Sequence, residues 1–210
     1  TVLGVDVGLT HLAIDSEGNK RANPRFLKRA QSNLRRKQKA LSRCQKGSKG
    51  RAKARLKLAK VHERLANARA DFQHNLSRQL IDENQAVVVE TLKVKNLLKN
   101  RKLSKHIADA SWFSLIQKLD YKAKAQGKHL VKIDQWFASS KTCSCCGHKV
   151  DALPLSVRNW SCPSCTAELD RDINAAINIR QQGVIKLRAE GLSVPANGGL
   201  RKPGHVPAAA

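Results

Sequence analysis

The sequence has no methionine, few aromatic residues (three Trp, one Tyr and four Phe among 210 residues) and no apolar run of 18 residues. A membrane-spanning helix needs about 18 to 20 such residues, so none is expected. We also find no amphipathic segment with the aromatic face of a membrane anchor. The chain opens on a strand-like run, without a secretory leader or an initiator methionine. We therefore expect a fragment or processed product of a longer, cytoplasmic, nucleoid-associated prokaryotic protein.

Acidic residues are scarce. There are 16 Asp and Glu against 40 Lys and Arg, which gives a formal net charge of +24. Such a charge repels itself in a compact chain unless an anion neutralises it, and nucleic acid is the obvious polyanion. A lipid surface and the basic packing typical of ribosomal proteins are the alternatives. The composition therefore predicts a nucleic-acid partner.

Cysteine is concentrated in one region. Two Cys-x-x-Cys pairs, with fifteen residues between them, contain four of the six cysteines: Cys143, Cys146, Cys162 and Cys165. This spacing lets both thiolates of a pair face one ion, and four thiolates complete the closed tetrahedral site of a structural Zn²⁺. A redox function is the alternative, which two pairs at this spacing disfavour. We expect Cys145 and Cys44 to take no part.

Hydrophobic periodicity predicts a mixed α/β protein. Apolar runs bounded by turn residues are typical of strands, and apolar residues three or four positions apart are typical of helices. We expect strands at 2–7, 11–15, 86–90 and 129–134 and helices within 28–84, 109–126 and 170–182. The stretch 93–105 is basic and expected to be irregular.

Segment 28–84 is expected to form a basic helical hairpin. Gly47, Ser48 and Gly50 interrupt its helical pattern, and residues 28–69 hold sixteen Lys or Arg against one acid. A merely solvated helix mixes charges of both signs, so the excess of one sign favours an anionic partner. The candidate nucleic-acid-binding residues of the hairpin are Arg35, Arg36, Lys37, Arg51, Lys53 and Arg55.

Three acids occupy positions suited to a metal-dependent nuclease. Asp6 lies in the first strand, Glu90 ends a fully apolar strand, and Asp172 begins the last helix. Carboxylate oxygens bind Mg²⁺, and two such ions can activate water and neutralise the leaving oxygen of a phosphodiester. The alternatives are solvated acids at strand ends and an acid stabilised by a helix dipole. Asp170 competes with Asp172 as the third ligand.

Four segments resemble motifs of one family: Val2–Ala13, Val87–Leu97, Asp134–Gly147 and Leu169–Ile179. The first, second and fourth are similar to the three RuvC motifs, although Thr91 stands where the family more often has an acid. The third is similar to the serine–lysine approach to a zinc knuckle. The combination resembles the C-terminal nuclease half of the TnpB family, transposon-encoded RNA-guided nucleases related to type V CRISPR effectors.

This resemblance implies an RNase H-like (RuvC) mixed sheet flanked by helices, with an inserted basic hairpin and a four-cysteine zinc ribbon. We expect a core over 1–137 and 169–190, a ribbon over 138–168 and a disordered basic tail over 191–210. The resemblance implies two Mg²⁺, or Mn²⁺ in vitro, held by Asp6, Glu90 and Asp172. Asn174 is expected to support the metal ligands from behind, with helix packing as the alternative.

The same resemblance implies DNA and a guide RNA as partners. Ser139, Ser140 and Lys141 are expected to contact a nucleic-acid backbone. The wedge and recognition modules of the family's N-terminal half are expected to be missing from this chain. A transposase that joins strands and a non-catalytic zinc protein that binds nucleic acid are the alternative functions.

Overall fold

The computed structural model describes residues 1–192, and the predicted tail lies almost entirely outside them. A five-stranded sheet with the order β3-β2-β1-β4-β5 forms the centre. Its strands are β1 (Val2–Asp6), β2 (His11–Asp15), β3 (Lys20–Ala22), β4 (Ala86–Glu90) and β5 (His129–Ile133). Strands β1, β4 and β5 are parallel, whereas β2 and β3 are antiparallel to their neighbours.

The four predicted strands are confirmed, and β3 was not predicted. Its three residues are mostly exposed and carry no apolar alternation, so the sequence offered no strand signal there. Pairing with β2, and not the burial of its own side chains, holds it in the sheet.

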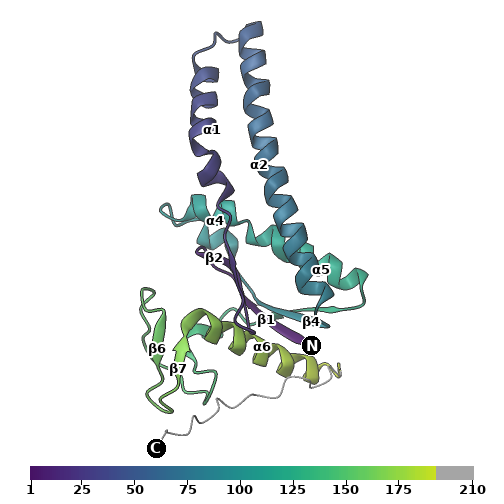
Figure 1. The fold of residues 1–210 in the computed structure, drawn as a ribbon, viewed down its shortest axis with the longest axis vertical. Coiled ribbons are helices and arrows are strands. Elements are labelled where there is room, and N and C mark those ends of the chain that lie inside the picture. The colour runs from purple at the N-terminus through teal and green to yellow at the C-terminus, as the bar shows by residue number, and fades with distance from the viewer. Residues whose placement is uncertain (193–210) are drawn as a thin grey trace, which may run out of the picture.

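The predicted basic hairpin is confirmed as two helices, α1 (Phe26–Ser42) and α2 (Lys49–Asp82), which extend away from the sheet (Figure 1). Ser48 ends the turn between them, since its side chain caps α2 by accepting a hydrogen bond from the Arg51 backbone N–H. Most of the buried residues of α2 lie toward its end near the sheet, including Leu76, Leu80 and Ile81, and Val61 is the buried residue farther out along the helix. The distal part of the hairpin therefore presents charge to solvent.

The single helix predicted over 109–126 is wrong in detail. This region instead contains two helices, α4 (Ser104–Ala110) and α5 (Trp112–Ala125). They are separated at Ser111, whose φ of 53° lies in the left-handed region. The stretch 93–105 is not wholly irregular either, because it contains the short helix α3 (Val94–Leu97) and the start of α4. Gln73 Nε2 donates hydrogen bonds to the carbonyls of Ala110 and Ser111, which stabilises the break.

The two faces of the sheet are covered by different helices. Side chains alternate along a strand, so Val87 and Val89 of β4 pack in the large core with α2, α4 and α5. Ala86 and Val88 point the other way, into a smaller core with Ile179 and Leu187 of α6 (Arg171–Ala189). Helix α6 was predicted to end near 182 and continues for two further turns. No helix within residues 1–192 is long and apolar enough to cross a membrane.

Two glycines allow α6 to lie directly on the sheet. A Cβ at Gly4 of β1 would come within 2.1 Å of the Ala176 carbonyl oxygen and 2.6 Å of the Arg180 nitrogen, both in α6. A Cβ at Gly183 of α6 would meet the Val88 side chain of β4 at 2.3 Å. Both strands thus contact the helix backbone closely, and the start of α6 is brought to the carboxyl ends of β1 and β4.

We expect Gly4→Ala to destabilise the protein by about 3 kcal/mol or more, because the obstructing atoms belong to a helix backbone and cannot rotate away. Gly50→Ala is the matched control, since Gly50 is exposed in α2 and an added Cβ would meet nothing closer than Ser48 Oγ at 3.8 Å. This control should keep or raise stability by up to about 1 kcal/mol. Urea denaturation of both variants tests the contact, and equal midpoints would contradict it.

Candidate functional site

The sheet brings two of the predicted acids side by side. Parallel pairing aligns Val5 of β1 with Val89 of β4, so Asp6 and Glu90 follow at the same level on neighbouring strands. Side chains alternate between the two faces of a strand, so Asp6 and Glu90 lie on the same face of the sheet as Gly4 and Val88. That face is covered by α6. The carboxyl ends of adjacent parallel strands are a common location for ligand sites.

The third acid, Asp172, lies in the first turn of α6. Burial, followed by the negative charges of Glu90 and Asp172, raises the pKa of Asp6 to about 8, against the smaller opposing effects of the Val7 N–H and Arg171. The three carboxylates are therefore within electrostatic reach of one another, although Asp6 keeps some contact with solvent. Such a cluster of like charges is stabilised by a cation, and oxygen ligands suit a hard divalent one.

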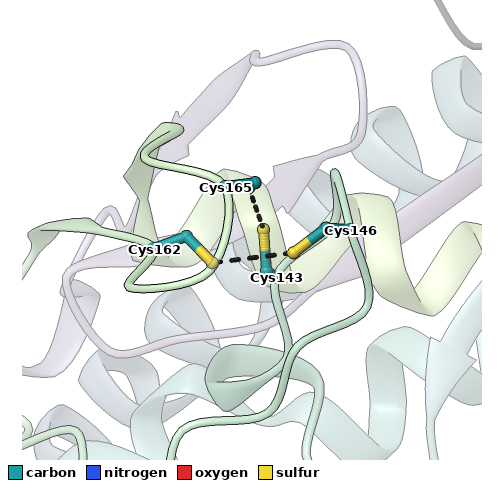
Figure 2. Close-up of side chains that lie close together, drawn as sticks. All are labelled: Cys143, Cys146, Cys162 and Cys165. Atoms are coloured by element: carbon teal, nitrogen blue, oxygen red, sulfur yellow. Dashed lines mark hydrogen bonds between the residues drawn. The ribbon is translucent and has the colours of Figure 1, made fainter.

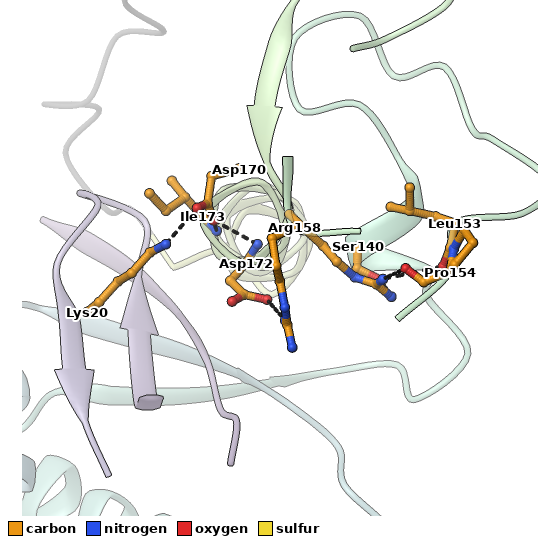
Figure 3. A network of polar contacts seen from close by, with 9 residues as sticks. Lys20, Ser140, Leu153, Pro154, Arg158, Asp170, Asp172 and Ile173 are labelled. Carbon is orange, nitrogen blue, oxygen red and sulfur yellow. Dashed lines mark hydrogen bonds and ion pairs between the residues drawn. The ribbon is translucent and has the colours of Figure 1, made fainter. Parts of the chain in front are cut away.

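Asp170 has a different function from Asp172. Its carboxylate caps α6 by accepting hydrogen bonds from the N–H groups of Asp172 and Ile173, and Lys20 Nζ donates to it at 2.6 Å (Figure 3). Asp172 instead forms an ion pair with the exposed Arg158 at 3.0 Å. Asp170 is therefore bound by the helix terminus and a lysine, whereas Asp172 is the one of the two acids whose charge acts on Asp6.

Ser139 is buried and belongs to the carboxylate site. The short helix η1 (Ser139–Lys141) places its hydroxyl so that it donates a hydrogen bond to Glu90 Oε1. Its carbonyl oxygen accepts hydrogen bonds from the side chains of Asn174 and Asn178 in α6. Ser139 is therefore placed to orient Glu90, and its buried hydroxyl already has that carboxylate as its partner.

Ser140 and Lys141 are partly exposed, but both have partners within the chain. Lys141 Nζ donates to the Asp151 carbonyl at 2.8 Å. Arg171 lies 3.5 Å from Ser140 Oγ and donates to the Pro154 carbonyl at 2.6 Å. These contacts connect η1, the segment that follows the first cysteine pair, and the start of α6.

Asn174 is 1% exposed and fixes the approach to the cysteines. Its Nδ2 donates to the Thr142 carbonyl, and its Oδ1 accepts from the Ser144 N–H, both at 2.8 Å. Asn174 thus acts on the acids only through the Ser139 backbone. Asn178, which the sequence analysis did not single out, makes similar contacts from the next turn of α6. The i, i+4 spacing of the two asparagines was the available signal.

The structure gathers the four predicted cysteines into one cluster. Their sulfur atoms all lie within 4.8 Å of one another, and Cys145 is exposed outside this group. Two of the sulfur–sulfur separations are 3.7 Å, for Cys143–Cys165, and 3.6 Å, for Cys146–Cys162 (Figure 2). The cluster is compatible with a structural Zn²⁺. Strands β6 (Asn159–Ser161) and β7 (Glu168–Asp170) form a two-stranded sheet that leads from it into α6.

The acids form a looser cluster than the cysteines. Within residues 1–192, the four cysteines are the only group of three or more His, Cys, Asp or Glu side chains close enough together to hold one metal ion. In this structure the three carboxylates are therefore not close enough to share one ion without movement.

The candidate basic residues of the hairpin differ in their surroundings. Arg35, Arg36, Lys53 and Arg55 are exposed, and Lys37 is partly exposed. Arg51 is also partly buried, and its guanidinium donates to the carbonyls of Leu41 and Cys44 at 3.1 and 3.2 Å. Arg51 therefore stabilises the turn of the hairpin.

Two protein-family models match parts of this chain. Residues 1–101 match the family model OrfB_IS605, described as "Probable transposase". Residues 112–179, which contain η1, the cysteine cluster and the start of α6, match the Cas12f1-like TNB domain. The chain belongs to the TnpB family. The predicted family is thus confirmed.

Two similar proteins support the assignment of this chain to the TnpB family. A protein of Streptomyces pristinaespiralis named "Putative RNA-guided DNA endonuclease" is 48% identical over 182 residues, which are 87% of this chain and 45% of the relative. A "TnpB-like protein" of Acanthamoeba polyphaga mimivirus is 30% identical over 143 residues, 65% of this chain and 27% of the relative. The chain therefore spans about half, or less, of the length of these curated relatives.

A solved structure shares the fold of the TnpB chain. The cryo-EM structure of a Cas12f1–sgRNA–target DNA complex superimposes with a TM-score of 0.62 and 17% identity. The match covers 85% of this chain and 49% of the Cas12f1 chain. At this identity the likeness establishes the mixed α/β fold.

Cys162→Ser should reduce bound zinc from one ion per chain to well below one, because three thiolates and a hydroxyl form a poorer tetrahedral site. Cys145→Ser is the control and should keep the full zinc content, since Cys145 lies outside the cluster. Metal analysis of the purified variants, with limited proteolysis around 138–168, provides the measurement. Equal zinc contents would contradict the ligand assignment.

Asp6→Asn should stabilise the protein in EDTA at pH 8 more than at pH 4. The folded-state pKa of Asp6 is about 8, above the unfolded value near 4. The wild-type carboxyl group therefore disfavours folding increasingly as the pH rises from about 4 to 8. The upper bound is about 5 kcal/mol, and residual contact with solvent should reduce it.

The measurement is the urea midpoint of unfolding as a function of pH, with Asp71→Asn on the exposed surface of α2 as control. The difference between Asp6→Asn and wild type should shrink when Mg²⁺ replaces EDTA. A difference that does not depend on pH would show that the acid is not buried beside like charges.

Proposed function

We propose that this chain is the nuclease part of an RNA-guided DNA endonuclease, with an RNase H-like (RuvC) core. The observation that carries the proposal is the placement of Asp6, Glu90 and Asp172 where β1, β4 and α6 meet, with the raised pKa of Asp6. The carboxylate cluster requires cations, whereas the chain as a whole has a net charge of +24 and attracts polyanions. This combination suits a site that brings metal ions to a phosphodiester. The names of the relatives support DNA as the substrate.

Two Mg²⁺, or Mn²⁺ in vitro, would supply an activated water and neutralise the leaving oxygen. The residues of the chain hold and orient the ligands. Ser139 fixes one oxygen of Glu90, Asp170 and Lys20 fix the start of α6, and Arg158 offsets the charge of Asp172. These contacts limit the movement of the acids before a substrate arrives.

We propose a structural Zn²⁺ at the four cysteines, in a ribbon over 138–168 that separates the core segments 1–137 and 169–190. Asn174, Asn178 and Arg171 support this arrangement, because they bind the ribbon and its approach to the first turns of α6. The ribbon would thereby determine where Asp172 and Ser139 lie. Loss of zinc would then disturb the acids as well.

Guide RNA and target DNA are the proposed partners, and the hairpin α1–α2 is the proposed contact with their backbones. The Cas12f1 complex contains both kinds of nucleic acid, which supports this choice. The Streptomyces relative is about twice as long as the region it shares with this chain. We propose that wedge and recognition modules outside residues 1–210 complete the programmable enzyme, acting in a prokaryotic cytoplasm near the nucleoid.

Strand transfer is the second candidate function, favoured by the transposase description of the matching family model. Both functions can use the same three acids. They differ in products, because a transposase yields joined strands and a nuclease yields only cut ends. Sequencing of the products therefore distinguishes them.

We expect Asp6→Asn, Glu90→Gln and Asp172→Asn each to reduce cleavage of DNA in Mg²⁺ by more than about 100-fold, because outer-shell partners of metal ligands alone are worth 10- to 100-fold. Asp170→Asn is the matched control. Asparagine also caps helices, so this variant should keep most of the activity.

The assay uses the chain with its co-purified RNA and without it, in Mg²⁺ and in EDTA, on single-stranded and double-stranded DNA. Binding is measured in parallel by fluorescence anisotropy. Binding without cleavage in any metal would favour a non-catalytic protein. A greater loss of cleavage in Asp170→Asn than in Asp172→Asn would make Asp170, and not Asp172, the third ligand.

Replacing Arg35, Arg36 and Lys37 together by Gln should weaken DNA binding and lower the slope of log affinity against log salt by about 2 to 3, since about 0.9 counterions are released per phosphate contact. Arg51→Gln is the control because its guanidinium binds carbonyls within the hairpin. It should lower the melting temperature with a smaller change in slope. An unchanged slope in the triple variant would place the nucleic-acid contacts elsewhere.

A further inference from the structure

An exposed tryptophan, Trp136, lies in the loop that leads from β5 to Ser139 and the carboxylate site. Trp136 leaves 80% of its surface exposed, whereas Trp112 is buried in the large core. Indole side chains contribute strongly to binding when they are covered, and an exposed one in a chain with three Trp indicates a contact surface.

The sheet fixes the position of this tryptophan relative to Glu90. Strands β4 and β5 pair so that Glu90 lies opposite Ile133. Lys93 follows Glu90 by three residues, and Trp136 follows Ile133 by three residues. The two side chains meet above the edge of the sheet, with Lys93 Nζ 5.7 Å from the centre of the Trp136 ring.

The loop that carries Trp136 is held at both ends. Asp134 accepts a hydrogen bond from the Trp136 N–H at 2.8 Å, and its carbonyl accepts one from Phe137. Phe137 packs against the small core under α6, and Ser139, two residues later, binds Glu90. The backbone carrying the indole is therefore anchored next to the acid, so a ligand on the ring would be positioned relative to the proposed metal site.

The surroundings of Trp136 favour an anionic ligand. Lys93 and Lys132 both lie in exposed positions on the strand and loop that flank the tryptophan. An apolar protein segment would have to cover these two ammonium groups, whereas a nucleic-acid backbone would neutralise them.

We propose that Trp136 is a stacking platform for an unpaired nucleobase of the DNA strand that enters the carboxylate site. With four-fifths of its surface exposed, the indole has at least one open face, and Lys93 can pair with the phosphate next to the stacked base. Stacking tolerates every base because each has a π-face, so the platform would hold the strand without reading its sequence. This inference rests on the proposed nuclease function, because it assigns the site a single-stranded substrate.

The test measures binding of fluorescently labelled oligothymidylate and of a duplex of the same length to the full chain in EDTA, where no cleavage takes place. Trp136→Ala should weaken binding of the single strand by about 5- to 100-fold, with a smaller effect on the duplex and an unchanged salt slope. Trp136→Phe should restore most of the affinity. Lys93→Gln should lower the salt slope for the single strand by about 0.7.

Leu155→Ala is the matched control, because Leu155 is also 80% exposed and lies on the ribbon. Its affinity and melting temperature should equal those of the wild type. Intrinsic tryptophan emission gives an independent readout, since oligothymidylate should quench the wild type and have little effect on Trp136→Phe.

Equal affinity of Trp136→Ala and wild type for the single strand would overturn the proposal and leave a protein partner as the occupant of this surface. Equal losses for single strand and duplex, with a lower melting temperature, would also overturn it by showing a structural function. The binding test is independent of the cleavage assay in Mg²⁺. If Trp136 stacks on the single strand but the chain does not cut DNA in Mg²⁺, only the nuclease proposal is refuted. Cutting without stacking would refute only the platform.

Discussion

The direct contact between α6 and the sheet is the constraint on which the rest of the site depends. Gly4 and Gly183 remove the side chains that would otherwise separate helix from strands, so the backbones approach closely. This contact fixes the height and direction of α6, and with them the position of Asp172 relative to Asp6 and Glu90. It also brings Asn174 and Asn178 to the carbonyls of the segment before the cysteines. One packing interface therefore positions both candidate metal centres.

The site combines opposing electrostatic requirements. Burial, followed by the negative charges of Glu90 and Asp172, disfavours ionisation of Asp6, while the chain as a whole carries a large positive charge. Nearby hydrogen bonds and cations reduce this repulsion without removing it, through Ser139 on Glu90 and Arg158 on Asp172. A protein of this kind attracts a polyanion over long distances and still retains a local demand for cations. This division of charge is what the proposed chemistry requires.

Several elements could be predicted from local patterns. The apolar strands β1 and β4 and the glycine-interrupted hairpin were recognised because hydrophobic periodicity and turn residues are local properties. The break at Ser111 and the strand β3 were missed, since the first is stabilised by Gln73 of a distant helix and the second by pairing with β2. The length of α6 was underestimated because its last turns are held by packing against β4 and β5.

The sequence by itself determined the chemical types present: four thiols at zinc spacing, acids at the ends of apolar strands, and a hairpin with charge of one sign. Only the tertiary structure decided how the candidates divide their functions. It assigned Asp170 to the cap of α6, Ser139 to Glu90, Arg51 to the turn of the hairpin, and Trp136 to an exposed edge. The reason is physical: a hydrogen bond or ion pair depends on distances set by strand register and helix packing, which residue spacing along the chain does not specify.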